Sequence, residues 1–190
     1  EHKQIKISKR DYIDDWVKLI KHKDAPLSIP HEVPLNKMSI ELKKYITVVL
    51  SGEGADELFG GYGRVQRSPM DWGKIKFFKY LLGPSLSRIL VKRSSKNSLF
   101  KNLRFNNHMD HFLSVYNWVP FEQKWNLFSD EVLSELQKDK KLFQIINEIF
   151  FNTQHIDPYD RVLHFFEKIH LYCLLDRLDM MSMAASVEAR

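Results

Sequence analysis

A glycine-rich, acidic segment at residues 51–62 contains the residue types best suited to chemistry in this chain. Twelve residues hold four glycines and three carboxylates: Gly52, Glu53, Gly54, Asp56, Glu57, Gly60 and Gly61. Glycine permits positive φ and lets the backbone approach a ligand closely. Backbone N–H groups at the start of a helix bind phosphate or carboxylate groups, so this segment is a candidate anion site.

The three carboxylates change the chemistry expected of this segment. They repel phosphate unless Mg²⁺ bridges the two, and Mg²⁺ prefers a few carboxylates together with substrate oxygens and water. A carboxylate here could also hold a substrate ammonium or move a proton. The residue types therefore indicate a metal–nucleotide site without specifying the reaction. The alternative is a glycine-rich turn in which Asp56 and Glu57 complement the dipole of a following helix.

A short β-branched run at residues 46–50 directly precedes the segment and predicts a strand. The run is apolar except for Thr47, as expected for a strand covered on both faces. In open α/β sheets, ligands bind at the ends of strands in this orientation. The segment at 51–62 would then begin at the carboxyl end of a buried strand.

Two helices are predicted upstream of this strand. Ser8 and Asp11 form a candidate capping box for the first. Its apolar face is expected to hold Ile13, Trp16, Val17 and Ile20. That helix should end before Pro26, because residues 24–36 contain three prolines and are typical of an ordered loop. A second helix is expected at about 35–44.

After Tyr62 the chain predicts helices and no further strand. Residues 110–118 and 121–128 are helical candidates, and an i, i+3, i+4, i+7 stripe marks another at Leu142, Ile145, Ile146 and Ile149. Asp157 and Pro158 predict a helix start, with Asp as the N-cap and Pro at the first helical position. The buried face of that last helix is expected to hold Val162, Phe166, Ile169 and Cys173.

The region from Arg64 to Arg104 is strongly basic, with eleven Lys or Arg against one acid, Asp71. Aromatic residues are interleaved with these charges: Trp72, Phe77, Phe78 and Tyr80. Such a block could contact nucleic acid or anionic lipid. A solvated helical excursion is favoured instead, with its aromatics packed inward and its lysines in water, because no nucleic-acid motif accompanies the charge. Neither a nucleic-acid nor a membrane partner is therefore expected.

The composition is that of an ordinary globular protein, with 44% hydrophobic and 28% charged residues. The chain has a single cysteine, Cys173, which excludes an internal disulfide. No stretch reaches eighteen uncharged apolar residues, so the sequence predicts no membrane-spanning helix. The eight histidines lack zinc-site spacing. The N-terminus shows neither an initiator Met nor a signal-peptide pattern, and the C-terminus shows no stop signal. We therefore expect the chain to be cut from a longer one.

The whole pattern S-G-E-G-x-D-E-x-F-G-G-Y at residues 51–62 resembles the second nucleotide loop of the glutamine-dependent asparagine synthetase family. Two further segments resemble the family in the same order. Upstream they are Asp24-x-Pro26, Val33-Pro34-Leu35 and Met38-Ser39; downstream, residues 176–190 are similar to the family's D-R-x-x-M-A-x-S-x-E-x-R segment. Between these segments, the resemblance is only in general character.

The resemblance implies a fold of the α/β class, an ATP-pyrophosphatase (adenine nucleotide alpha hydrolase-like) domain with a parallel sheet and a large helical excursion. Residues 1–62 would be the α/β part with the nucleotide loop. Residues 63–157 would be the helical excursion, and residues 158–190 a helix and loop that return to the site. The whole chain, 1–190, would be part of the C-terminal synthetase domain.

The activity implied by the resemblance is ATP-dependent asparagine synthesis through β-aspartyl-AMP, with AMP and pyrophosphate as products. Ser51 and Gly52 would contact ATP, Glu53 would be the catalytic carboxylate beside the acyl-adenylate, and Asp56 would bind Mg²⁺. The supporting residues would be Gly54, Glu57, Tyr62, Glu188 and Arg190. Glu188 and Arg190 would organise the site. The alternative for these two residues is a simple ion pair in a loop. For Asp176 and Arg177 the alternative is a salt bridge that ends a helix.

The resemblance also implies partners and leaves alternatives. Aspartate and ATP would be substrates, ammonia would come from a glutaminase domain of the same full-length chain, the location would be cytoplasmic, and a homodimer is one open oligomeric state. The related β-lactam-forming synthetases carry a tyrosine-type base at the position of Glu53. A glutamate at this position therefore favours intermolecular amide formation. A family amidotransferase acting on a cell-envelope sugar or a secondary-metabolite carboxylate is the second hypothesis, and a non-catalytic binding module is the third.

Several parts of the family's machinery do not occur in this sequence. The pyrophosphate-binding S-G-G-x-D-S loop, the nucleophilic cysteine of the glutaminase and a lysine-bearing loop after Arg190 are absent from residues 1–190. We therefore expect these residues alone to show no ATP turnover.

Overall fold

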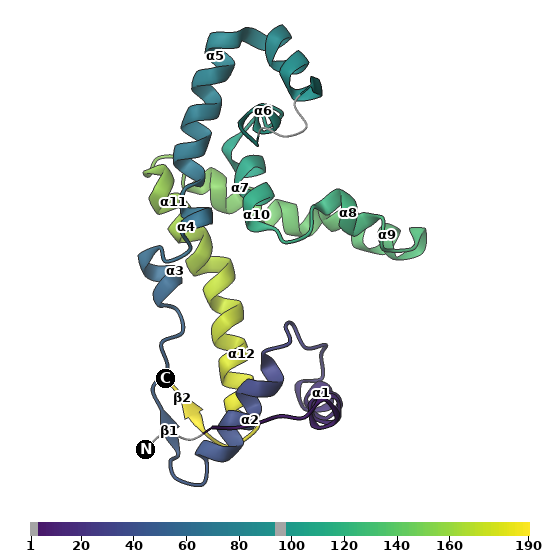
Figure 1. Ribbon diagram of the computed structural model, residues 1–190, viewed down its shortest axis with the longest axis vertical. Helices are drawn as coiled ribbons and strands as arrows, with labels where there is room; N and C mark the ends of the chain where they lie inside the picture. Colours follow the sequence, from purple (N-terminus) through teal and green to yellow (C-terminus); the bar gives the residue numbers. More distant parts are fainter. Residues whose placement is uncertain (1–3, 94–97) are drawn as a thin grey trace. The chain divides into compact units, whose positions relative to one another are not determined.

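The computed structural model describes residues 4–93 and 98–190 (Figure 1). The chain divides into two compact units. The first unit comprises Glu1–Leu58 and Glu167–Arg190, and the second comprises Phe59–Phe166.

The first unit carries a small parallel sheet and the helices around it. Its elements are α1 (Lys9–Lys23), α2 (Glu32–Leu42), β1 (Val48–Val49), α3 (Ala55–Phe59), the π-helix η2 (Phe166–Leu171), α12 (Tyr172–Met183) and β2 (Glu188–Ala189). Helix α2 packs on both α1 and α12. The Asn36 side chain in α2 donates to the backbone oxygen of Met181 in α12, at 2.9 Å.

Helices are the regular elements of the second unit in its described residues. Its elements are α4 (Gly63–Gln66), α5 (Ser68–Arg93), α6 (Ser98–Asn102), α7 (His108–Tyr116), α8 (Phe121–Trp125), α9 (Asp130–Leu136), the 3₁₀-helix η1 (Gln137–Asp139), α10 (Lys140–Asn152) and α11 (Pro158–Phe165). An aromatic cluster around the fully buried Phe112 forms its core, with Phe150, Phe165 and Phe166 at 4.8–6.5 Å between ring centroids. Helix α5 is broken at Gly83, whose φ of 70° and ψ of 172° are not helical.

The predicted helix starts at Ser8 and Asp157 are confirmed. The Ser8 side chain accepts a hydrogen bond from the Asp11 backbone N–H at 3.1 Å, and α1 ends at Lys23, before Pro26. Asp157 accepts from the Tyr159 N–H at 2.8 Å, with Pro158 at the first helical position of α11. Both caps satisfy backbone donors that a helix leaves unpaired at its start, so sequence alone locates them.

The apolar face predicted for α1 is wrong for three of its four residues. Ile13, Val17 and Ile20 are exposed, and the buried residues of this helix are Asp15 and Leu19. Asp15 is buried because Lys37 of α2 lies 2.7 Å from its carboxylate and Lys18 lies 3.1 Å from it. Leu19 joins a core formed with Leu27, Val33 and Met181. An ion pair between two helices thus decides which face is covered, and the spacing of apolar residues does not reveal it.

Helix α2 begins at Glu32, three residues before the predicted start. The Glu32 carboxylate accepts the backbone N–H groups of Ser28 and Ile29 at 2.6 and 3.2 Å, and Lys23 lies 3.2 Å from it. Pro34 stands in the first turn of the helix, where a missing N–H costs nothing. Helix α2 therefore starts earlier than the three prolines indicated, with Glu32 in its first turn.

The predicted strand at 46–50 is shorter and more exposed than expected. It is reduced to β1, which pairs in parallel with β2 in the register Val48 with Glu188 and Val49 with Ala189. Ile46, Val48 and Leu50 are exposed, so the prediction of a strand covered on both faces is wrong for the described residues, whose sheet has only these two strands. The prediction of no further strand after Tyr62 is also wrong, because Glu188–Ala189 forms β2, a strand of two residues that is too short to show a clear alternating pattern.

The last helical run changes phase in its middle. Val162 and Phe166 are buried as predicted, but Cys173 is exposed. The π-helical segment η2 lies between them, and its wider turns add a residue to the helical repeat. After it, the buried positions are Leu178 and Met181, so a constant 3.6-residue period fails at η2.

The basic region also differs from its prediction. Trp72 and Phe78 are half-buried, but Phe77 and Tyr80 are exposed, at 62% and 90%. Both lie far around α5 from the buried Ile75, at about 200° and about 140° for a helix of 3.6 residues per turn. The expectation that the aromatics pack inward is therefore wrong for these two residues. No helix in the described part of the chain is long and apolar enough to cross a membrane.

Candidate active site

The start of the glycine-rich loop is fixed to the end of β2. The Ser51 N–H donates to the Arg190 backbone oxygen at 2.7 Å, and the Arg190 N–H donates to the Val49 oxygen at 2.9 Å. These bonds extend the parallel ladder one residue beyond the assigned strands. Ser51 and Gly52 are exposed at this point, where a ligand can reach their backbone. Figure 1 shows β1 and β2 side by side, with the chain running on from β1 toward α3.

The carboxylate of Glu53 is held from a distant part of the sequence. Its Oε1 accepts a hydrogen bond from Nη2 of Arg177 in α12, at 2.9 Å. The Arg177 side chain is mostly buried, whereas the Glu53 side chain is about a third exposed. One carboxylate oxygen is therefore oriented by a mostly buried guanidinium, and the other can accept a proton or a hydrogen bond. This arrangement suits a positioned base.

A second acid–base pair lies on the same two segments. Glu57 in α3 is only 1% exposed, and His170 in η2 places Nε2 3.7 Å from the Glu57 Oε1. Burial lowers the pKa of His170, the Glu57 carboxylate opposes this effect, and the positive charge of Arg177 adds to it. Because Glu57 is buried, we interpret it as a residue that supports the loop from its buried side. Glu53 and Asp56 are exposed instead.

Gly54 occupies the sharpest position of the loop. Its φ is +96°, and its carbonyl accepts the Leu58 N–H at 3.0 Å, which closes the first turn of α3. A Cβ built at this residue would lie 2.8 Å from Cδ1 of Leu171. Gly54 thus lets the backbone turn beside η2, so its role here is conformational.

Replacing Gly54 with Ala is expected to lower the free energy of unfolding by about 1–2 kcal/mol, because an L-residue is strained at this φ. The Leu171 methyl is the end of a flexible side chain and can move, so the backbone supplies most of the cost. Gly52→Ala is the matched control, since nothing lies within 4 Å of its added Cβ. Urea unfolding of both variants tests this, and equal midpoints for the two would contradict it.

Asp56 is the residue of the loop that the sequence predicts as a metal ligand. It is exposed in the first turn of α3. In residues 4–93 and 98–190, no group of three or more His, Cys, Asp or Glu side chains is arranged to hold a metal ion. Mg²⁺ commonly binds through one or two carboxylates plus substrate phosphates, so one exposed carboxylate fits a metal that arrives with its nucleotide. Helix α3 has only five residues, so the dipole explanation for Asp56 and Glu57 carries little weight.

The remaining predicted residues divide between the two units. Glu188 and Arg190 lie beside the loop through the β1–β2 ladder, and their side chains pair at 2.8 Å on the surface. Tyr62 lies in the second unit, where it caps α4 and stacks on Phe166 at 5.2 Å between ring centroids. Its observed contact is therefore one of packing.

The partners of the two loop acids are not predictable from local sequence. The alternative in which Asp176 and Arg177 end a helix as a salt bridge is excluded, because α12 continues to Met183 and Arg177 instead contacts Glu53. His170 belongs to no motif in the sequence. It lies seven residues before Arg177, a spacing of two helical turns, and this spacing is the signal that relates them. The acids themselves are identifiable because they are close together in sequence.

Comparison with known proteins gives a consistent result. The family model described as asparagine synthase matches residues 1–190. The chain is 48% identical over 64 residues to the glutamine-hydrolysing asparagine synthetase 1 of Bacillus subtilis. The matched stretch is 34% of this chain and 10% of that protein. The chain is 38% identical over 78 residues to putative glutamine-hydrolysing asparagine synthetases of Mycobacterium bovis and Mycobacterium tuberculosis, covering 41% of this chain and 11% of each relative. No solved structure matches the chain.

Proposed function

The chain belongs to the asparagine synthase family, and from that premise we propose that it serves the ATP-dependent conversion of aspartate to asparagine, with ammonia released from glutamine. AMP and pyrophosphate are the other products. The observation that carries this proposal is the Glu53 carboxylate, exposed just after β1 and oriented by Arg177 at 2.9 Å. Such a group suits an amide-forming step in which nitrogen must lose a proton.

The proposed reaction has two steps. First, a side-chain carboxylate oxygen of aspartate attacks the α-phosphorus of ATP, the bond to the β-phosphate oxygen breaks, and β-aspartyl-AMP and pyrophosphate form. Second, ammonia attacks the acyl carbon, the carbon–oxygen bond to AMP breaks, and the surplus proton on nitrogen passes to Glu53. Holding the carboxylate in place before ammonia arrives reduces the ordering needed in the transition state.

The remaining roles are assigned to residues of the same loop. Ser51 and Gly52 would contact the nucleotide, since both are exposed where the backbone leaves the β1–β2 ladder. Asp56 would bind Mg²⁺, whose charge would stabilise the departing pyrophosphate. Glu57 and His170 would support the loop from its buried side. Glu188 and Arg190 would keep the loop start in register through β2.

The proposal is tested by measuring AMP and pyrophosphate release with ATP, Mg²⁺ and ammonia, with and without aspartate, in a full-length protein that carries this chain. Release that depends on aspartate and yields asparagine is the expected result. Release that ignores aspartate but responds to another carboxylate would replace this function with a different family amidotransferase. Silence with every carboxylate would favour a binding module. Residues 1–190 alone are the comparison sample, and we expect them to be inactive.

Arg177→Met is expected to lower the kcat of asparagine formation about ten- to a hundredfold with little change in the KM for ATP, because the Glu53 carboxylate loses its orienting partner. Arg177 is a positioning residue in this proposal. Arg177→Lys should restore part of the loss, since a lysine keeps the charge without the planar guanidinium. Steady-state kinetics of both variants measure the effect.

The control for this substitution is Arg88→Met, which removes an exposed arginine from α5 in the second unit and should leave the rate unchanged. An equal loss in the Met and Lys variants would contradict a role through charge and orientation. A rise in the KM for ATP at constant kcat would instead indicate that Arg177 acts in nucleotide binding.

A further inference from the structure

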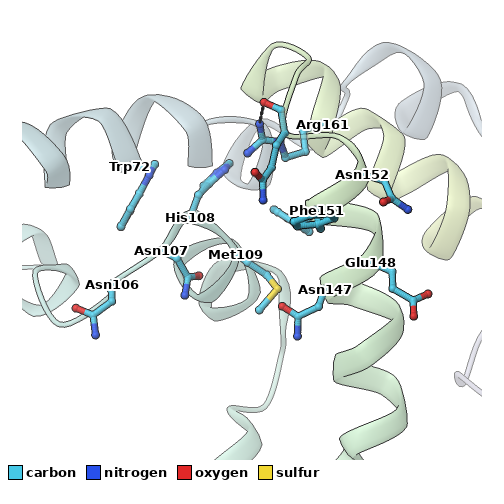
Figure 2. Close-up of a pocket in the computed structure, with 12 residues that line it drawn as sticks. Trp72, Asn106, Asn107, His108, Met109, Asn147, Glu148, Phe151, Asn152 and Arg161 are labelled. Atoms are coloured by element: carbon cyan, nitrogen blue, oxygen red, sulfur yellow. Dashed lines mark hydrogen bonds between the residues drawn. The ribbon is translucent and has the colours of Figure 1, made fainter.

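A hollow within the second unit is lined by residues that the proposed reaction does not use. Its cavity volume is about 820 Å³, within the usual range of small-molecule sites. Residues of α5, α7, α10 and α11, with the segments next to α7 and α10, form its walls (Figure 2). Every lining residue lies between Phe59 and Phe166, so the hollow belongs to this unit alone.

A buried polar and aromatic cluster orders two of the residues that line the hollow, Trp72 and His108. The Ser68 hydroxyl lies 3.2 Å from Nε2 of His108 and 3.1 Å from Nδ1 of His111, and all three side chains are buried. The Trp72 ring stacks on both imidazoles at 6.3 Å between centroids. His108 and Trp72 both line the hollow, so a ligand would meet an ordered surface there.

The charges around the hollow balance. Arg161 and Glu148 are the two formally charged side chains that line it. The Arg161 guanidinium is held by backbone oxygens, donating to Thr153 at 3.1 Å and to Gln154 at 3.0 Å. Burial lowers the pKa of His108 to about 4, so its imidazole is neutral near pH 7. A ligand with a net charge would find no matching excess of charge here.

Amide side chains dominate the rim. Four of the nine asparagines of the chain line this hollow together with one glutamine, and the five are Asn106, Asn107, Asn147, Asn152 and Gln154. Asn107 is committed to capping α7, where it accepts the Asp110 N–H at 2.8 Å. Figure 2 shows Asn106 and Asn107 on one side and Asn147 and Asn152 on the other. Asn147 and Asn152 are exposed on α10, so they can turn toward a ligand.

We propose that this hollow binds a neutral, polyhydroxylated ligand of the carbohydrate type. A hydroxyl group both donates and accepts hydrogen bonds, and so does the amide of Asn or Gln. The apolar face of a sugar ring can rest on an aromatic side chain, for which Trp72 and the exposed Phe151 are available. The inference rests on the composition, charge and order of the hollow, and it is independent of the proposed amide synthesis.

Calorimetric titration of the protein with N-acetylglucosamine tests the proposal, with glucuronate as the anionic comparison and indole as the planar one. Saturable binding is expected for the neutral sugar and weaker binding for the other two. The double variant Asn147→Ala with Asn152→Ala should weaken sugar binding about tenfold, because two hydrogen bonds are lost. Alanine is the best helix former, so α10 should persist in this variant.

Asn126→Ala is the matched control, since it removes an exposed asparagine outside the hollow and should leave sugar binding unchanged. Three outcomes would overturn the proposal: no saturable binding of the neutral sugar, tighter binding of glucuronate or indole, or equal sugar affinity in the double variant and the parent. The comparison of the three ligands on the parent protein stands even if the double variant folds poorly.

Discussion

Glu53→Gln is expected to lower the rate of asparagine formation by about 10²–10⁴-fold, the usual contribution of a positioned acid–base group. Glutamine matches glutamate in shape, and its amide oxygen can still accept the bond from Nη2 of Arg177. The amide cannot take up the proton that ammonia must lose. The substitution therefore removes the proposed chemistry while keeping the contact that orders the loop.

The two half-reactions make this prediction sharper. If Glu53 acts on nitrogen, aspartate-dependent exchange between ATP and labelled pyrophosphate should survive in Glu53→Gln within a few-fold, while asparagine formation collapses. Loss of both would instead place Glu53 in nucleotide binding or in adenylation. Glu131→Gln, an exposed residue in the first turn of α9, is the control and should match the parent in both assays.

The second large effect concerns stability at mildly acidic pH. Burial holds the pKa of His108 at about 4 in the folded chain, against an ordinary value of 6.5, and the nearby charge of Arg161 acts in the same direction. Below pH 6.5 the unfolded chain therefore binds more protons than the folded chain. The stabilisation by neutral His108 is complete above that pH and is lost as the pH falls toward 4, by about 3 kcal/mol over the window.

Other groups add to this loss or act outside its window. Burial also lowers the pKa of His111 and of His170, so both contribute in the same direction. The hydrogen bond from Lys37 lowers the pKa of Asp15. Burial raises the pKa of Asp139, but its hydrogen bonds from Lys124 and Trp125 outweigh that effect and leave it lowered. An aspartate ordinarily titrates near 3.8, so these two acids lose their stabilisation only below the histidine window.

Urea unfolding at about pH 7 and about pH 4.5 measures the effect. The His108→Gln variant should show a clearly smaller difference between the two conditions than the parent, because the largest titrating group is gone. His22→Gln is the control, since His22 is exposed in α1 and should leave the difference unchanged. An unchanged pH difference in His108→Gln would contradict the assignment.

The sequence by itself determined the features that depend on neighbouring residues. The caps at Ser8 and Asp157 and the end of α1 before Pro26 follow from interactions within a few positions, and glycine permits the positive φ found at Gly54. Local hydrogen bonding and glycine's conformational freedom act at that range. The motif at 51–62 also sufficed to indicate the family to which the chain belongs, because its length makes chance agreement rare.

Only the tertiary structure decided the pairings across long stretches of chain. Glu53 and Arg177 are 124 residues apart, and the β1–β2 pairing joins segments about as distant. The phase change at η2 moved the buried face away from Cys173, and the ion pair of Asp15 with Lys37 chose the covered side of α1. Each of these features depends on which surfaces come into contact when the chain folds. Packing and charge pairing between distant segments leave no periodic signal in either segment alone.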